Sequence, residues 1–215
     1  MAIIPEKDTE ALRDMFNQVL VAPVKMVFFK SASCEYCQDE ETLLSEVAAL
    51  SDKVTIVVKD LDQDSEEAKS LGVEYAPGLV LLAGENKTGV VFTGGPFGYE
   101  FSSLIEAIKM ISVGDTGLSD DVKKKVKAIA VPAKIRVFVT PSCPYCPRAV
   151  ITAHQFALEN PLIIGEMVEA QEFPEMSQLY SVYAVPKVVI NEKTEFEGAL
   201  PEKQFLEYLL EATAG

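Results

Sequence analysis

The sequence is poor in basic residues and in long apolar runs, and both shortages exclude classes of partner. Lysine and arginine number 19 against 33 aspartates and glutamates, for a net charge of −14. This balance disfavours nucleic acid and anionic membranes, which need a basic surface. The longest apolar stretches, such as residues 78–84, are far too short to span a bilayer. Because no basic segment followed by an apolar one opens the chain, we expect no secretory signal and a cytoplasmic protein.

Histidine and cysteine are also scarce, and tryptophan is absent. A Ser-His-Asp or Cys-His mechanism would have to use the single histidine, His154, for which we expect an ordinary structural place on a helix. Four cysteines are too few for a disulfide scaffold. They form two C-x-x-C pairs, Cys34 with Cys37 and Cys143 with Cys146. In an intracellular chain this spacing indicates redox or metal chemistry.

The chain contains an internal repeat. The second cysteine pair follows the first at a spacing of 109 residues, and Pro77 and Pro186 are separated by the same interval. Gly114 and Gly117 lie between the two copies and favour a break there. We therefore predict two domains: an N-terminal unit of residues 1–117 with the CEYC site, and a C-terminal unit of residues 118–215 with the CPYC site.

Each copy shows the same order of helical and strand patterns. The first has expected helices at 8–20, 41–50, 65–72 and 100–111, and expected strands at 24–29, 53–61, 78–83 and 88–94. The second has expected helices at 119–129, 149–159, 174–181 and 201–212, and expected strands at 134–139, 161–169, 187–191 and 195–199. The predicted fold class is α/β, with a mixed sheet flanked by helices in each unit.

In each copy the cysteine pair follows a strand and opens a helix. We expect the first cysteine, Cys34 or Cys143, to start that helix, where unpaired backbone N–H groups and the helix dipole favour a thiolate. The second cysteine, Cys37 or Cys146, lies one turn later on the same face and can attack a mixed disulfide formed at the first. The first cysteines are the candidate nucleophiles and the second are the resolving thiols.

This order of elements, with C-x-x-C after the first strand and a proline before a hairpin, resembles the thioredoxin fold, and "SCPYC" is similar to a glutaredoxin active site. The tandem resembles the protein disulfide oxidoreductases of thermophilic archaea and bacteria, relatives of protein disulfide isomerase. The resemblance implies that Pro77 and Pro186 are cis and lie against the cysteine pairs. It also implies that Ala76 and Val185 offer backbone groups to a bound substrate strand.

The chain departs from thioredoxin at a position that carries chemistry. Six residues before the first cysteine, where thioredoxin has a buried aspartate, it has Phe28 and Val137. The proton acceptor for the resolving cysteines is therefore not identified. The two sites also differ in charge: Glu35 lies within the first, whereas Arg148 follows the second. We expect the lower pKa at Cys143 and the more reactive site in the second copy.

The expected activity is thiol–disulfide exchange on protein substrates, with Tyr36 and Tyr145 as candidate substrate contacts and with reduction, oxidation and isomerisation all open. No Gly-rich dinucleotide motif follows a strand, so we expect no cofactor and a separate thioredoxin-reductase-like flavoprotein as electron donor. One alternative is an electron carrier to a peroxiredoxin. The N-terminal part of the alkyl hydroperoxide reductase flavoprotein is also a double thioredoxin-like unit, but it keeps one C-x-x-C. Two further alternatives also stay open. One is a non-catalytic scaffold held together by zinc with four thiolate ligands, and the other is a binding module made of two inactive thioredoxin-like units.

Overall fold

The computed structural model describes residues 2–214, and its two halves repeat one order of elements. The first half comprises α1 (Glu6–Val19), β1 (Val24–Lys30), α2 (Cys37–Ala48), β2 (Val54–Asp60), α3 (Ser65–Leu71), β3 (Gly78–Ala83), β4 (Asn86–Thr93), a short 3-10 helix η1 (Gly98–Glu100) and α4 (Phe101–Val113). The second comprises α5 (Asp120–Lys127), β5 (Ala133–Val139), α6 (Cys146–Glu159), β6 (Ile163–Glu169), α7 (Pro174–Leu179), β7 (Lys187–Ile190), β8 (Thr194–Glu197) and α8 (Glu202–Thr213). The expected α/β class and element order are confirmed.

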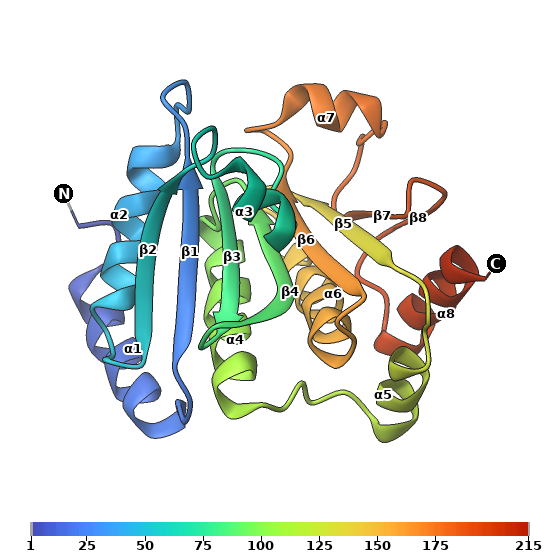
Figure 1. The fold of residues 1–215 in the computed structure, drawn as a ribbon, viewed down its shortest axis with the longest axis horizontal. Helices are drawn as coiled ribbons and strands as arrows, with labels where there is room; N and C mark the ends of the chain where they lie inside the picture. Colours follow the sequence, from blue (N-terminus) through green and yellow to red (C-terminus); the bar gives the residue numbers. More distant parts are fainter. Residues whose placement is uncertain (1, 215) are drawn as a thin grey trace.

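The strands of both halves form one eight-stranded mixed sheet in the order β2-β1-β3-β4-β6-β5-β7-β8. The halves meet where β4 pairs in parallel with β6, from Val90 opposite Gly165 to Thr93 opposite Val168. Figure 1 shows the sheet running across the molecule, with the blue-to-green half on one side and the yellow-to-red half on the other. Because β1, β4, β6 and β5 all run in one direction, the loops after β1 and β5 lie at the same edge of the sheet.

Helices cover the two faces of the sheet unequally. Side chains from α1, α2, α4, α5, α6 and α8 pack into one large core on one face. On the other face α3 and α7 each cover a smaller cluster, one per half. Strand β1 is apolar on both sides, with Met26, Val27, Phe28 and Phe29 all buried, which is why its sequence does not alternate. No helix within residues 2–214 is long and apolar enough to cross a membrane.

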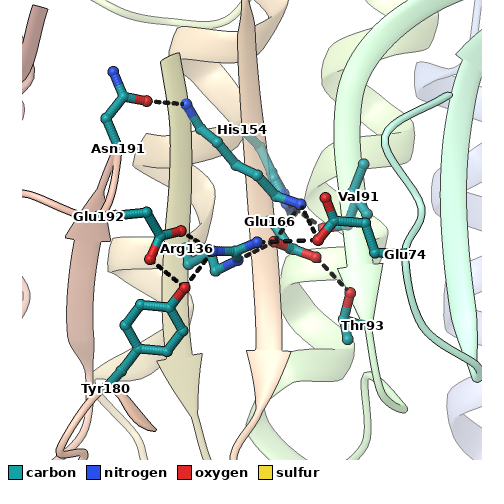
Figure 2. A network of polar contacts seen from close by, with 10 residues as sticks. Glu74, Val91, Thr93, Arg136, His154, Glu166, Tyr180, Asn191 and Glu192 are labelled. Carbon is teal, nitrogen blue, oxygen red and sulfur yellow. Dashed lines mark hydrogen bonds and ion pairs between the residues drawn. The ribbon is translucent and has the colours of Figure 1, made fainter. Parts of the chain in front are cut away.

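A buried polar network ties the halves together on the face between α3 and α7 (Figure 2). Glu166 on β6 is fully buried and accepts hydrogen bonds from Thr93 Oγ1 at 2.7 Å and from Arg136 Nε at 2.9 Å. Arg136 also donates to Glu74 of the first half at 3.0 Å, to Tyr180 Oη at 2.7 Å and to Glu192. These contacts satisfy the buried carboxylate of Glu166, which would otherwise be costly to desolvate.

Candidate functional site

The two cysteine pairs occupy equivalent places, directly after β1 and β5. Both pairs are disulfide-bonded, with Cα atoms 5.5 Å apart in the first pair and 5.6 Å apart in the second. One expectation was wrong: the helices begin at the second cysteines, Cys37 and Cys146, and not at the first. Cys34 and Cys143 lie in the turn before the helix, a place from which a sulfur atom can accept a bond from the free N–H groups of the helix end.

The second pair shows this arrangement directly. The backbone N–H of Cys146 donates to Cys143 Sγ at 3.2 Å. Such a bond stabilises negative charge on Cys143, as does the N-terminal end of α6. Cys143 is buried, with 8% of its surface exposed, whereas Cys34 of the first site is partly exposed.

Each half contains a cis-proline, as the resemblance implied. The Ala76–Pro77 and Val185–Pro186 peptide bonds are both cis. In the second site the carbonyl oxygen of Val185 lies 3.8 Å from Cys143 Sγ, which places this residue against the dithiol. The two prolines have matching partners, because the Pro77 oxygen accepts a bond from Gly94 N at 2.9 Å and the Pro186 oxygen accepts one from Gly198 N at 2.8 Å.

The two sites are too far apart to act as one metal centre. Strands β1 and β5 are four steps apart in the sheet, about 19 Å at about 4.8 Å per step. A zinc ion holds its sulfur ligands at about 2.3 Å, so one ion cannot bind all four thiolates. Within residues 2–214 no group of three or more His, Cys, Asp or Glu side chains is arranged to hold a metal.

Sequence reasoning missed a buried carboxyl group near the second site. Glu100, at the end of η1, is 1% exposed, and its Oε1 atom has no hydrogen-bond partner. Burial raises the pKa of this carboxyl to about 7, although Ser103 donates to Oε2 at 2.6 Å and acts in the opposite direction. The preceding residues hold it beside the loop that leads to Cys143, since Tyr99 N donates to Pro141 O at 3.0 Å.

Close packing at Gly98 explains the position of Glu100. Gly98 has a φ of +60°, and a Cβ atom there would lie 2.2 Å from the Pro141 oxygen. Only glycine allows so close an approach of the two loops. Nothing in the local sequence "GYEFSS" distinguishes Glu100 from an exposed acid at a helix start. The contact that positions this segment joins Gly98 to Pro141, a residue of the other half.

A different set of carboxyl groups, each with at least one buried oxygen, lies near the first site. Glu40 in the first turn of α2 is fully buried, and neither of its carboxyl oxygens has a hydrogen-bond partner. Glu169 and Glu172, at and after the end of β6, each have one such oxygen. Burial raises the pKa of all three and sets that of Glu172 at about 7. Neighbouring negative charge also raises two of these pKa values: the charge of Glu172 raises that of Glu40, and the charge of Glu169 raises that of Glu172.

The remaining candidates lie apart from this chemistry or at its rim. His154 is fully buried in α6, packs edge-on against Phe92 and has a pKa lowered by burial to about 4, so it is a neutral core residue. Tyr36 and Tyr145 lie between the cysteines of their pairs and are 42% and 71% exposed. Their predicted contact with substrate stays a prediction.

Fold and cysteine pairs together define the class: the protein is a thiol–disulfide oxidoreductase built from two thioredoxin-like units. A family profile described as a thioredoxin domain matches residues 133–211. The protein disulfide oxidoreductase of Aeropyrum pernix is 33% identical, with a TM-score of 0.90 over 97% of this chain and 93% of that one. The chain belongs to the family of thioredoxin-fold protein disulfide oxidoreductases.

A second group of similar proteins comprises reductases and dehydrogenases. The alkylhydroperoxide reductase AhpF of Enterococcus faecalis is 30% identical, with a TM-score of 0.89 over 98% of this chain and 99% of the solved chain. An NADH dehydrogenase of Ferdinandcohnia aciditolerans is 27% identical over 92% of this chain, but this chain spans 36% of that protein. For the corresponding alkyl hydroperoxide reductase of Staphylococcus epidermidis the share is 27%. The chain thus spans about a third of the length of these curated relatives.

Proposed function

We propose that the protein exchanges thiols and disulfides with protein substrates at both cysteine pairs, in the cytoplasm. The observation that carries this proposal is the repeated constellation of a dithiol at a helix start with a cis-proline beside it. Two intact sites on one continuous sheet suit a general oxidoreductase that reduces, forms or rearranges disulfides. A substrate strand would pair with the backbone of Ala76–Pro77 or Val185–Pro186, with Tyr36 and Tyr145 at the rim.

The second site supports a specific order of events. The Cys143 thiolate attacks a substrate disulfide, releases one substrate thiolate and forms a mixed disulfide. Cys146 then gives its proton to Glu100, attacks Cys143 Sγ, and releases the second substrate thiolate as the Cys143–Cys146 bond forms. A carboxyl group with a pKa of about 7 suits this transfer, because its proton affinity is close to the working pH.

Net reduction of substrate disulfides needs a source of electrons outside the described residues. We propose that the protein itself carries no cofactor and that a separate thioredoxin-reductase-like flavoprotein reduces its disulfides. Similarity to proteins named NADH dehydrogenase and alkyl hydroperoxide reductase supports a link to pyridine-nucleotide chemistry.

A second candidate function is electron delivery to a peroxiredoxin. The likeness to the alkylhydroperoxide reductase AhpF over nearly the whole chain favours it. Two complete cysteine pairs favour the broader disulfide exchange. The two functions differ in the protein that accepts the electrons, but the chemistry of the dithiols is the same.

A redox titration tests the proposal. The protein is equilibrated in graded dithiothreitol buffers, and free thiols and bound zinc are counted in the same samples. We expect two metal-free two-electron transitions, with turnover of both an insulin disulfide and an oxidised peroxiredoxin measured afterwards. One zinc per chain with thiols that resist oxidation would contradict the proposal, and turnover of the peroxiredoxin alone would select the second candidate.

A further inference from the structure

Two carboxyl groups near the first cysteine pair come from different halves of the molecule: Glu40 is fully buried, and Glu172 is half-buried. Glu40 lies three residues after Cys37 in α2, and both side chains are buried. Residues three apart on a helix are neighbours on one face. Glu40 therefore lies next to the resolving thiol of the first site, at a position where the second half has the small residue Ala149.

Glu172 approaches the first site from the second half. Its Oε1 atom accepts a hydrogen bond from Gly95 N at 2.8 Å. The neighbouring Gly94 N donates to the oxygen of Pro77, the cis-proline of the first site. Gly94 has a φ of +92°, and a Cβ atom there would lie 2.6 Å from Glu169 Cβ and 3.3 Å from Glu172 Cδ. Glycine thus lets the loop after β6 approach the first site closely.

The pair lacks the partners that buried carboxylates usually have. Both oxygens of Glu40 and Oε2 of Glu172 have no hydrogen-bond partner. No ion pair within residues 2–214 includes Glu40, Glu169 or Glu172. The titratable groups near the pair include Glu169 at the end of β6 and the cysteines themselves, and the pocket that Glu172 lines also contains Tyr75, Arg136, Glu175 and Tyr180. Two fully ionised carboxylates here would be costly, so at neutral pH the pair holds a proton.

We propose that Glu40 and Glu172 share one proton and together form the acid–base group of the first dithiol, with Glu40 facing Cys37. This rests on the proposed thiol–disulfide exchange and assigns its missing proton acceptor at the first site. The Cys37 thiol gives its proton to the pair, and the thiolate attacks Cys34 Sγ of a mixed disulfide. The Cys34–Cys37 bond forms, the Cys34–substrate bond breaks, and two electrons leave with the substrate thiolate, which can take the proton from the pair.

The test isolates the resolving step at the first site. In the full chain with Cys143→Ser and Cys146→Ser, Cys34 is converted to its thionitrobenzoate mixed disulfide, and release of thionitrobenzoate by Cys37 is timed by stopped flow from pH 5 to 9. This leaving group needs no proton, so the rate reports deprotonation of Cys37. The test variants are Glu40→Gln and Glu172→Gln. The matched controls are Asp39→Asn and Glu175→Gln, which make the same kind of change at exposed residues.

The two variants have different expected signatures. Glu40→Gln should slow release at pH 7 about 100-fold and remove the carboxyl inflection from the pH profile. Glu172→Gln should keep that inflection but move it to lower pH, because the like charge beside Glu40 is gone. Both controls should match the parent, and neither glutamate variant should alter turnover at the second site in a chain lacking the first pair.

The outcomes separate the two levels of inference. A parent that never releases thionitrobenzoate overturns the proposed function of the first site. An active parent with unchanged rates and profiles in both variants overturns only the role of the carboxyl pair. Should Glu40→Gln fail to fold in thermal unfolding, the Glu172→Gln profile decides, and an unshifted inflection there overturns the shared proton.

Discussion

The two cysteine pairs have the same backbone setting and different electrostatic surroundings. At the second pair the Cys146 N–H bonds to Cys143 Sγ, Arg148 follows on α6, and the buried carboxyl group of Glu100 lies nearby. At the first pair Glu35 lies between the cysteines, and buried acids adjoin them. A fold that repeats its scaffold can thus set two dithiols to different reactivities, because scaffold and charge are specified by different residues.

The largest expected effect comes from removing one pair at a time. A chain with Cys34→Ser and Cys37→Ser should keep most of its disulfide turnover, whereas one with Cys143→Ser and Cys146→Ser should keep roughly a tenth. A difference of one unit in nucleophile pKa changes the thiolate fraction about tenfold. Alkylation by iodoacetamide as a function of pH measures each nucleophile separately. Equal rates, or the opposite order, would contradict the comparison.

Replacing Glu100 sharpens the comparison at the second site. Glu100→Gln should slow the resolving step there on the order of 100-fold at pH 7 and remove an inflection near pH 7, because the buried proton acceptor is lost. The first site should be unaffected. Thionitrobenzoate release in single-pair chains measures both effects. An equal loss at the two sites would indicate a general structural defect.

The buried polar network around Glu166 and Arg136 allows a test of whether the stability of one half depends on the other. Arg136→Met removes the main cation from the fully buried Glu166 and should destabilise the whole chain by about 3 kcal/mol, although Lys134 remains 3.1 Å from that carboxylate. Urea unfolding followed at both sites should show one shifted transition. The exposed Lys193→Met is the control and should stay within about 0.5 kcal/mol of the parent.

The raised pKa of Glu100 also makes stability depend on pH. The folded state holds this proton more tightly than the unfolded state, so the contribution is fully present below the ordinary pKa of 4.5 and is lost as pH rises through about 7. The loss is on the order of 3 kcal/mol at most. Glu100→Gln cannot ionise, and its stability should fall less between pH 5 and 8.5 in denaturant titrations. A parallel fall in both chains would contradict this assignment.

The smallest expected effects are at the exposed tyrosines. Tyr36→Ala and Tyr145→Ala should each raise the KM for a protein disulfide a few-fold at their own site and change stability by less than about 0.5 kcal/mol. Tyr145 should matter more, because it is more exposed and belongs to the more reactive pair. Unchanged KM values with a protein substrate would remove both residues from the substrate surface.

The sequence by itself determined the repeat, the α/β class, the order of elements, the cysteine pairs and the prolines that prove to be cis. These features are local: they depend on spacing along the chain and on hydrophobic pattern within one element. One local expectation was off by a single turn, since each helix starts at the second cysteine, because the first belongs to the turn that presents it.

Only the tertiary structure decided how the halves join and which acidic side chains lie near the cysteine thiols. Thr93 bonds to Glu166 across 73 residues, and Gly95 bonds to Glu172 across 77. Glu40 and Glu100 look like exposed acids at helix starts, and only packing against other segments buries them. Burial is a property of what lies opposite a side chain, so a pattern read along one segment does not contain it.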